Sequence, residues 1–368
     1  MRQLQDVTDK LFIDTSREHE LARELWARIC QDPLLDAKMK AVDCQWLLPT
    51  WNGPLDAVVS LEQGIDSYTV VALDGSQIYP DRHQGTACYL INIGSVILNY
   101  TSGTSSVSFD SSPCVYVGED EDGLEISAEL VNCRRQELEF TQGLRIAREL
   151  KKTMQGSSPM VFLIDGSLIF WHLESKEMDL KNTFLSRYLA SLHLLHQERV
   201  LTAGYISLPK NKELVNLLRV ALCDYKVENC TVYKEIDHII DTSVAHFYLP
   251  PYSRTTIFKN HASICKQYPD SLHPHFFYLN VGTEIGRVEI PAWIAADSAA
   301  VDTICRIMID QSLKGRGYPI GLAEAHEQAV VKGPDREFFY QLITKIGMEY
   351  KQRMTVSQKS MKKRQMGV

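Results

Sequence analysis

The sequence predicts an α/β fold in which a mixed β-sheet is flanked by helices. Three β-branched runs come first, at 67–80, 87–100 and 106–118, and short polar turns separate them. This pattern is typical of an antiparallel meander. Strand-like and helical runs then alternate, which favours further strands packed under helices. The composition, 45% hydrophobic and 23% charged, is that of a globular chain able to bury a core.

The remaining elements follow from hydrophobic spacing. Leu21, Leu25 and Ile29 recur at helical intervals, so an amphipathic helix is predicted over 17–31. A long helix is predicted over 126–154, followed by the short strand MVFLIDGSL. Further elements are helices near 180–197 and 211–222 with the strand TAGYISLP between them, the strands FFYLNVG and GRVEIPAWI, a helix over 296–313, a helix carrying Ala325-His326, and a last helix over 335–351.

The order of these elements suggests three regions. Residues 1–60 are predicted to be a helical N-terminal extension, and 66–350 the main domain, with a poorly assigned insert at 200–275 in which no elements are predicted beyond residue 222. Residues 354–368 contain a basic cluster at Lys359, Lys362, Lys363 and Arg364, which we expect to be a disordered, solvated tail.

Composition narrows the class of protein. No apolar run approaches the roughly 18–20 residues that span a bilayer, and the polar start MRQLQDVTDK has no signal-peptide core. The nine cysteines include no Cys-x-x-Cys pair. This pattern indicates reduced thiols and a cytoplasmic protein without membrane association. The net charge of −7 argues mildly against a chain coated by nucleic acid, but it leaves room for a local basic footprint.

Two Asp-Gly-Ser triplets, at Asp74 and Asp165, each follow a buried strand-like run. Taken singly, such a triplet is usually a turn. An Asp at the end of a buried strand, however, projects into the cleft where α/β sheets bind ligands. Two carboxylates that converge from neighbouring strands repel each other unless a cation neutralises them, and hard divalent ions prefer oxygen ligands. The pair therefore predicts a shared metal site.

A third carboxylate is expected from the helix between those strands. Glu137 and Glu139 lie on different faces of this helix, and either one alone also fits a solvated surface position. Glu139 is the preferred ligand because Arg135, one turn earlier, can orient it through an i,i+4 pair. Glu137 is the alternative.

Tyr318 and His326 are the other candidates. His326 follows Tyr318 by about two helical turns, on a segment entered through a Gly/Pro turn, so both can face one cleft. Imidazole is a ligand for Mn²⁺ as well as a general acid or base, and a tyrosine hydroxyl can bond a phosphate oxygen. Taken alone, a histidine on a helix is more often structural.

The sequence lacks the motifs of several other enzyme classes. The chain has no Gly-x-x-x-x-Gly-Lys-Ser/Thr loop and no Gly-x-Ser-x-Gly elbow, and Ser76 stands where an aspartyl-phosphate enzyme would have its second Asp. The loop pair His273 and His275 is a weak metal candidate, because no further ligands accompany it.

Taken together, these residues resemble the NurA nuclease family of DNA double-strand break repair. The resemblance rests on the order and spacing of VVALDGSQ with Asp74, the Arg-rich helix with Glu139, LIDGSL with Asp165, RVEIP at 287–291, and GYPIGLAEAH with Tyr318 and His326. It covers about residues 66 to 345, and 200–275 matches only loosely.

The resemblance implies a ribonuclease H-like core and a metal-dependent deoxyribonuclease. It implies that Asp74, Glu139, Asp165 and His326 hold Mn²⁺ or Mg²⁺, and that Tyr318 supports the phosphate or a metal-bound water. It also implies a homodimer that docks on a hexameric HerA-type translocase. In end resection, such an enzyme degrades DNA ends 5′ to 3′ and cuts single strands internally.

Two other readings remain open at this stage. One is a catalytically inactive partner of a DNA translocase, against which the retention of all four ligands argues. The other is an actin-like ATP-binding protein, whose phosphate-binding loops should be richer in Gly and Thr than any segment of this chain.

Overall fold

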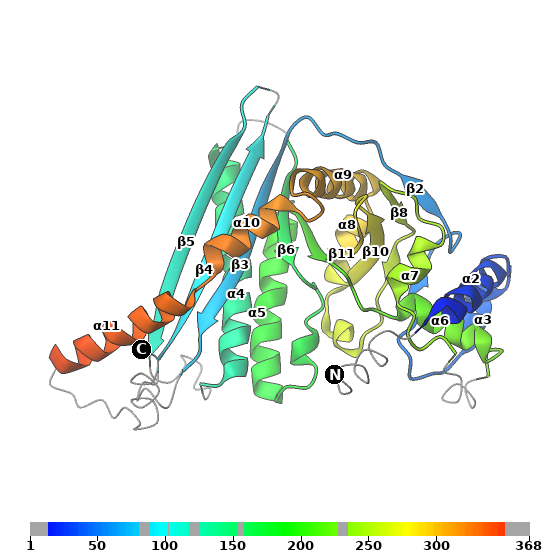
Figure 1. Ribbon diagram of the computed structural model, residues 1–368, viewed down its shortest axis with the longest axis horizontal. Helices are drawn as coiled ribbons and strands as arrows, with labels where there is room; N and C mark the ends of the chain where they lie inside the picture. The colour runs from blue at the N-terminus through cyan, green and yellow to red at the C-terminus, as the bar shows by residue number, and fades with distance from the viewer. Residues whose placement is uncertain are drawn as a thin grey trace, which may run out of the picture. The chain divides into compact units, whose positions relative to one another are not determined.

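The computed structural model describes residues 14–80, 88–101, 103–117, 126–153, 158–226 and 235–349 (Figure 1). The predicted tail, 354–368, lies outside them. The chain forms two compact units. The first unit combines Met1–Gly64 with Tyr205–Leu313, and the second combines Ile65–Gly204 with Lys314–Val368.

The second unit contains the predicted antiparallel meander. Its strands are β3 (Tyr68–Ile78), β4 (Cys88–Tyr100), β5 (Ser106–Val117), β6 (Met160–Asp165) and the part of β7 (Leu201–Ile206) that ends at Gly204. β4 pairs antiparallel with both β3 and β5, whereas β6 pairs parallel to β3. The resulting order, β5-β4-β3-β6-β7, is that of a ribonuclease H-like core. The fold class expected from the sequence is therefore confirmed.

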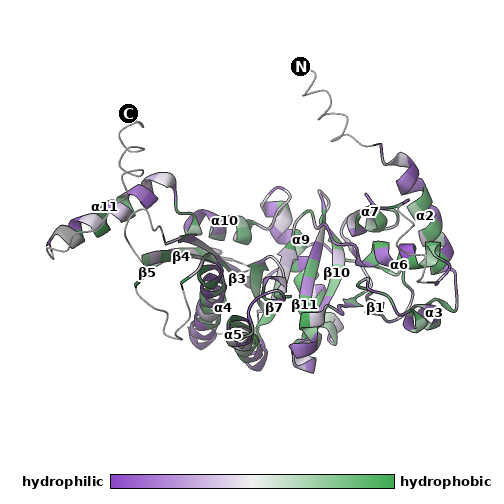
Figure 2. Ribbon diagram, turned by 90° about the horizontal axis from the view of Figure 1, so that it is seen from below, coloured by the Kyte–Doolittle hydropathy of each residue, from purple (hydrophilic) through white to green (hydrophobic). Residues whose placement is uncertain are grey.

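Helices cover both faces of this sheet. α4 (Ala128–Thr153) and α5 (Met178–Gln197) lie on one face, and α10 (Ile320–Ala329) crosses the other (Figures 1 and 2). All side chains of Tyr68–Leu73 in β3 are consequently buried, because neither face of the central strand meets water. α11 (Gly333–Glu349) follows α10 and packs Phe339 and Tyr340 against Ile78 and Cys88.

The first unit is built around the antiparallel pair β10 (Pro274–Asn280) and β11 (Ile285–Pro291). Short strands extend it through long-range pairing: β1 (Thr50–Trp51), β2 (Val58–Ser60), β8 (Ser253–Thr255) and β9 (Phe258–Lys259). Its helices are α2 (Ser16–Cys30), α3 (Leu35–Ala41), α6 (Glu213–Leu222), α7 (Asp241–His246), α8 (Ala292–Ala295) and α9 (Ser298–Lys314).

One expected boundary in this unit is wrong. The run GRVEIPAWI was predicted as a single strand, but β11 ends at Pro291 and α8 begins at Ala292. Pro291 has no N–H to donate to a sheet, and a proline favours the position just before or at the start of a helix. Among the described residues, no helix combines the length and the apolar character that a membrane span requires.

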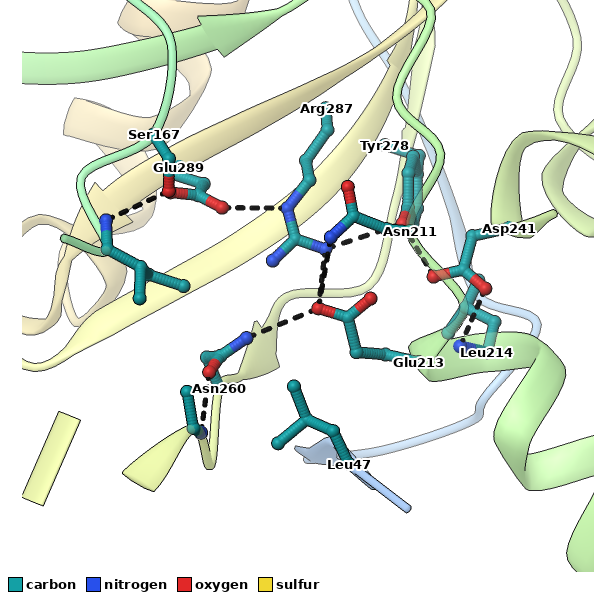
Figure 3. Close-up of polar contacts among 12 residues, drawn as sticks. Leu47, Ser167, Asn211, Glu213, Leu214, Asp241, Asn260, Tyr278, Arg287 and Glu289 are labelled. Carbon is teal, nitrogen blue, oxygen red and sulfur yellow. Dashed lines mark hydrogen bonds and ion pairs between the residues drawn. The ribbon is translucent and has the colours of Figure 1, made fainter. Parts of the chain in front are cut away.

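A buried polar network holds the first unit together (Figure 3). Arg287, with no exposed surface, bonds Glu289 at 2.8 Å and Glu213 at 2.9 Å, and its guanidinium lies 3.7 Å from the centre of the Phe276 ring. Arg287 and Glu289 come from the RVEIP motif. That motif therefore has a structural role here, since a buried charge is tolerated only when it is paired.

The same network caps a helix through Asp241. Its Oδ1 accepts the backbone N–H groups of Leu214 and Val215 at the start of α6, and its Oδ2 accepts the Tyr278 hydroxyl at 2.7 Å. Burial, together with the nearby charge of Glu213, raises the pKa of Asp241 to about 7. The network thus contains more acidic groups than Arg287 neutralises.

Candidate functional site

The five residues singled out in the sequence all lie in the second unit. Asp74 is on β3, Glu139 on α4 and Asp165 at the end of β6, while Tyr318 precedes α10 and His326 is on it. β3 and β6 are parallel neighbours, and the last pair in their register is Leu73 with Ile164. Asp74 and Asp165 each follow that pair, so they stand side by side on strands about 4.8 Å apart.

The two Asp-Gly-Ser triplets differ in backbone structure. Asp165 ends its strand as predicted, and Gly166 follows with a φ of 125°. The prediction for Asp74 is wrong, because β3 continues through the triplet to Ile78 and stays paired with β4. Asp74 is thus an inner residue of a long strand rather than part of a turn.

Position 75 requires a glycine because side chains of α4 lie directly against the backbone of β3 there. A Cβ added there would lie 2.6 Å from both Cγ of Arg135 and Oε1 of Glu139. Arg135 also donates to the Gly75 carbonyl at 2.8 Å. The absent side chain therefore lets α4 bring Glu139 against β3, beside Asp74.

Glu139 lies near enough to the two aspartates for their charges to act on it, whereas Glu137 pairs with other residues. The Glu139 side chain is 15% exposed, and its Oε1 lies 3.8 Å from Nε of Arg135. Burial, reinforced by the charges of Asp74 and Asp165, raises the pKa of Glu139 to about 8, against the opposing effect of Arg135. Glu137 instead pairs with Arg134 at 2.8 Å and Arg187 at 3.5 Å.

His326 and Tyr318 each contact one aspartate. Nδ1 of His326 lies 2.8 Å from Oδ2 of Asp74, whose Oδ1 accepts the Gly75 N–H. Burial raises the pKa of Asp165 and so does the charge of Asp74, whereas the hydrogen bond from Tyr318 and the charge of His326 lower it. The expectation that Tyr318 and His326 face the same site agrees with these contacts.

The donor set is chemically suited to a divalent cation. Three carboxylates and one imidazole are the ligands that Mn²⁺ takes, and burial, the main cause of the raised pKa values of Glu139 and Asp165, makes their negative charges costly unless a cation offsets them. As the side chains stand, no three His, Cys, Asp or Glu residues in the described part of the chain converge closely enough to hold an ion. Binding would therefore require side-chain rotation, beginning with the His326–Asp74 contact.

His273 and His275, which were expected to be a loop pair, lie in the first unit, where His273 precedes β10 and His275 is part of that strand. The His273 ring is 5.9 Å from that of His275 and 6.4 Å from that of His261. Burial lowers the pKa of all three, with Lys259 adding to the effect. They too form no metal-binding group among the described residues.

Contacts that the sequence analysis missed surround the site. Ser76 and Asn92 both donate to the carbonyl of Ala329 at the end of α10, and Arg135, which was expected only to pair with Glu139, also donates to the Gly75 carbonyl. The sequence pointed to Ser76, since it is the third residue of the repeated Asp-Gly-Ser triplet. Asn92 carried none, because its partner is 237 residues away in sequence.

Comparison with known proteins gives one family match. The model of the NurA domain matches residues 68–331, a range that includes all five candidate residues. No curated protein matches the chain.

Solved structures described as NurA align over most of the chain. A crystal structure of NurA is 12% identical and covers 94% of this chain and 97% of its own, with a TM-score of 0.41. A crystal structure of NurA with manganese is also 12% identical and covers 94% and 98%, with a TM-score of 0.40. A third, of NurA bound to dAMP and manganese, is 12% identical and covers 90% and 94%, with a TM-score of 0.37.

Proposed function

The chain belongs to the NurA family, and from this premise we propose that it is a metal-dependent DNA nuclease. The observation that carries the proposal is the placement of Asp74 and Asp165 side by side on parallel strands of a ribonuclease H-like sheet, with Glu139 facing them from α4. Neighbouring carboxylates that repel one another are costly unless a cation neutralises their charge. A phosphodiesterase uses such a site.

Each residue has a distinct task in this proposal. Asp74, Asp165 and Glu139 would hold Mn²⁺ or Mg²⁺ through carboxylate oxygens, and His326 would add an imidazole nitrogen. The bound ions would supply an activated water and stabilise the leaving 3′-oxygen. Tyr318, already hydrogen-bonded to Asp165, would donate to a phosphate oxygen of the DNA and orient the strand. Arg135 keeps Glu139 and the Gly75 backbone in place.

The finer activity is a proposal supported by the family resemblance. We propose single-strand endonuclease and 5′–3′ exonuclease activity in DNA end resection, as a cytoplasmic homodimer docked on a HerA-type hexameric ATPase. Labelling the 5′ or the 3′ end of the substrate distinguishes the polarities. The mass of the purified protein in solution tests the dimer, and co-purification with a HerA-type ATPase tests the partner.

Substitution of Asp74 tests the nuclease itself. Wild-type protein should cleave single-stranded DNA with Mn²⁺ and stop when EDTA is added. Asp74→Asn should lower the cleavage rate by at least about 10²-fold, because the variant keeps the shape but loses a charged ligand. Circular dichroism and the melting temperature should remain near wild type.

The same assay separates the rival functions. Wild-type-like cleavage by Asp74→Asn would contradict the assignment of Asp74 and its neighbours as the metal ligands. An inactive wild-type protein that still binds a translocase would identify a non-enzymatic partner. Thermal stabilisation by millimolar ATP would indicate an actin-like nucleotide-binding protein.

A further inference from the structure

The last turn of α10 is tied to the sheet by two side chains. Ser76 on β3 donates its hydroxyl to the Ala329 carbonyl at 2.5 Å. Asn92 on β4 donates its amide to the same carbonyl at 2.8 Å and to that of Gln328 at 3.2 Å. The last carbonyls of a helix lack partners within the helix, so these bonds satisfy groups that would otherwise be open.

Asn92 is itself held in position. Its side chain is buried, and its Oδ1 accepts the hydroxyl of Ser111 on β5 at 3.1 Å. A line of hydrogen bonds therefore runs from β5 through β4 to the end of α10. A buried amide whose oxygen and nitrogen are both engaged has one preferred orientation.

Gly94 sets the distance between helix and sheet. A Cβ added at this residue would lie 2.3 Å from the backbone N of Ala329 and 2.5 Å from the carbonyl O of Ala325. At Gly94, the backbone of α10 thus packs directly on the backbone of β4, and no flexible side chain separates them.

These contacts share their elements with the candidate metal ligands. Ser76 is two residues after Asp74 and on the same face of β3, and Ala329 is three residues after His326 on α10. β3 and α10 therefore meet twice, once at the His326–Asp74 contact and once at Ser76–Ala329. The His326 side chain is 60% exposed, so apart from its contact with Asp74 it is little enclosed by neighbouring side chains. Its location depends on where the helix backbone lies.

We propose that Ser76 and Asn92 are positioning residues, which together form a latch that fixes α10 on the sheet and sets the reach of His326 to Asp74. The proposal deepens the proposed function, since it takes His326 and Asp74 as ligands of one divalent ion. It assigns the third residue of the Asp-Gly-Ser triplet a task different from that of the first.

The test compares latch variants with a matched control. Ser76→Ala removes one donor, Ser76→Ala with Asn92→Ala removes both, and Ser76→Thr keeps the hydroxyl. Thr69→Val is the control, because Thr69 is also on β3 and bonds Asn99 on β4, away from α10. The readouts are Mn²⁺ binding by titration, hydrogen exchange of the α10 amides, and cleavage rate against Mn²⁺ concentration.

Loss of one neutral hydrogen bond should weaken Mn²⁺ binding by Ser76→Ala about fivefold, with a near wild-type rate at saturating Mn²⁺. The double variant should bind at least about 25-fold more weakly and exchange its α10 amides faster. Ser76→Thr should remain within about twofold of wild type. Thr69→Val should melt at a lower temperature but keep the wild-type Mn²⁺ midpoint.

The outcomes separate the latch from the nuclease. If the double variant binds Mn²⁺ like wild type and its α10 amides exchange no faster, the latch proposal is wrong, whatever the enzyme does. If both latch variants only melt earlier, as Thr69→Val does, the two residues are merely structural. If wild-type protein fails to cleave DNA while α10 exchange still rises in the variants, the proposed function fails and the latch holds α10 without serving catalysis.

Discussion

Each residue of the Asp74-Gly75-Ser76 triplet contacts a different part of the second unit. Asp74 meets His326, Gly75 leaves room for Glu139 and Arg135, and Ser76 bonds Ala329. A side chain on Gly75 would separate the helix from the strand. The triplet thus joins α4, β3 and α10, which explains why a motif resembling a turn lies within a continuous strand.

Glu139 and Glu137 provide a matched pair of substitutions. Glu139→Gln should lower Mn²⁺-dependent cleavage by at least about 10²-fold, because Glu139 faces the two aspartates. Glu137→Gln should leave the cleavage rate within about twofold. It should instead lower the free energy of unfolding by about 1–3 kcal/mol, because it breaks half-buried pairs with Arg134 and Arg187.

Steady-state kinetics and urea unfolding of the two variants measure these effects. Equal losses of cleavage in both would contradict the assignment of Glu139, as would loss of cleavage in Glu137→Gln alone. Helical periodicity showed only that the two carboxylates lie on different faces of α4. Which face meets β3 depends on Gly75, a contact across 64 residues of sequence.

At the scale of elements, helices and strands whose own residues show a clear hydrophobic periodicity were predictable from the sequence. α4 was expected over 126–154 and spans Ala128–Thr153, and the meander of β3, β4 and β5 is as expected. The segment 223–275, for which no elements were predicted, was not predictable in the same way. Its β8 and β9 have only three and two residues, and their existence depends on pairing with β10.

Gly94 shows how an element can be positioned by a missing side chain. Gly94→Ala should displace α10, because the new Cβ would meet the helix backbone at 2.3 Å rather than a flexible side chain. A displacement of about 1 Å at His326 would lower cleavage by about 10²-fold. The melting temperature should fall as well, since the helix covers one face of the sheet.

Gly103→Ala is the control for this substitution. A Cβ at Gly103 would meet nothing within 4 Å, so its cleavage rate and melting temperature should match wild type. Cleavage assays and thermal unfolding of both variants measure the difference. A fully active Gly94→Ala would mean that α10 moves without affecting the site.

At the scale of the whole molecule, each unit contains one buried acidic cluster. The cluster of the second unit includes Glu139, with a pKa raised to about 8, and that of the first includes Asp241, with a pKa raised to about 7. Sequence could not reveal either value, since burial causes both shifts and burial is a property of the folded chain. The net charge of −7 gives no information about where the acids gather.

These shifts fix the sign of the pH dependence. In the unfolded chain both carboxyls titrate near pH 4, so between about pH 4 and 8 the folded protein holds protons that the unfolded chain has released. The free energy of unfolding must then fall as pH rises, by at most about 1.4 kcal/mol per pH unit for each group. Below about pH 6.5 the depressed pKa values of His172 and His273 act in the opposite sense.

The clearest window is therefore pH 6.5 to 8.5, measured on metal-free protein by urea unfolding. Stability should decline across it, and Glu139→Gln should remove most of the decline above pH 7.5. Saturating Mn²⁺ should also remove most of the decline above pH 7.5 in the wild type, because a bound ion takes the place of the proton on Glu139. Asp241→Asn should remove only the part near pH 7, with or without Mn²⁺. A slope above pH 7.5 that survives both Glu139→Gln and Mn²⁺ would show that Glu139 is not the group whose proton the metal displaces.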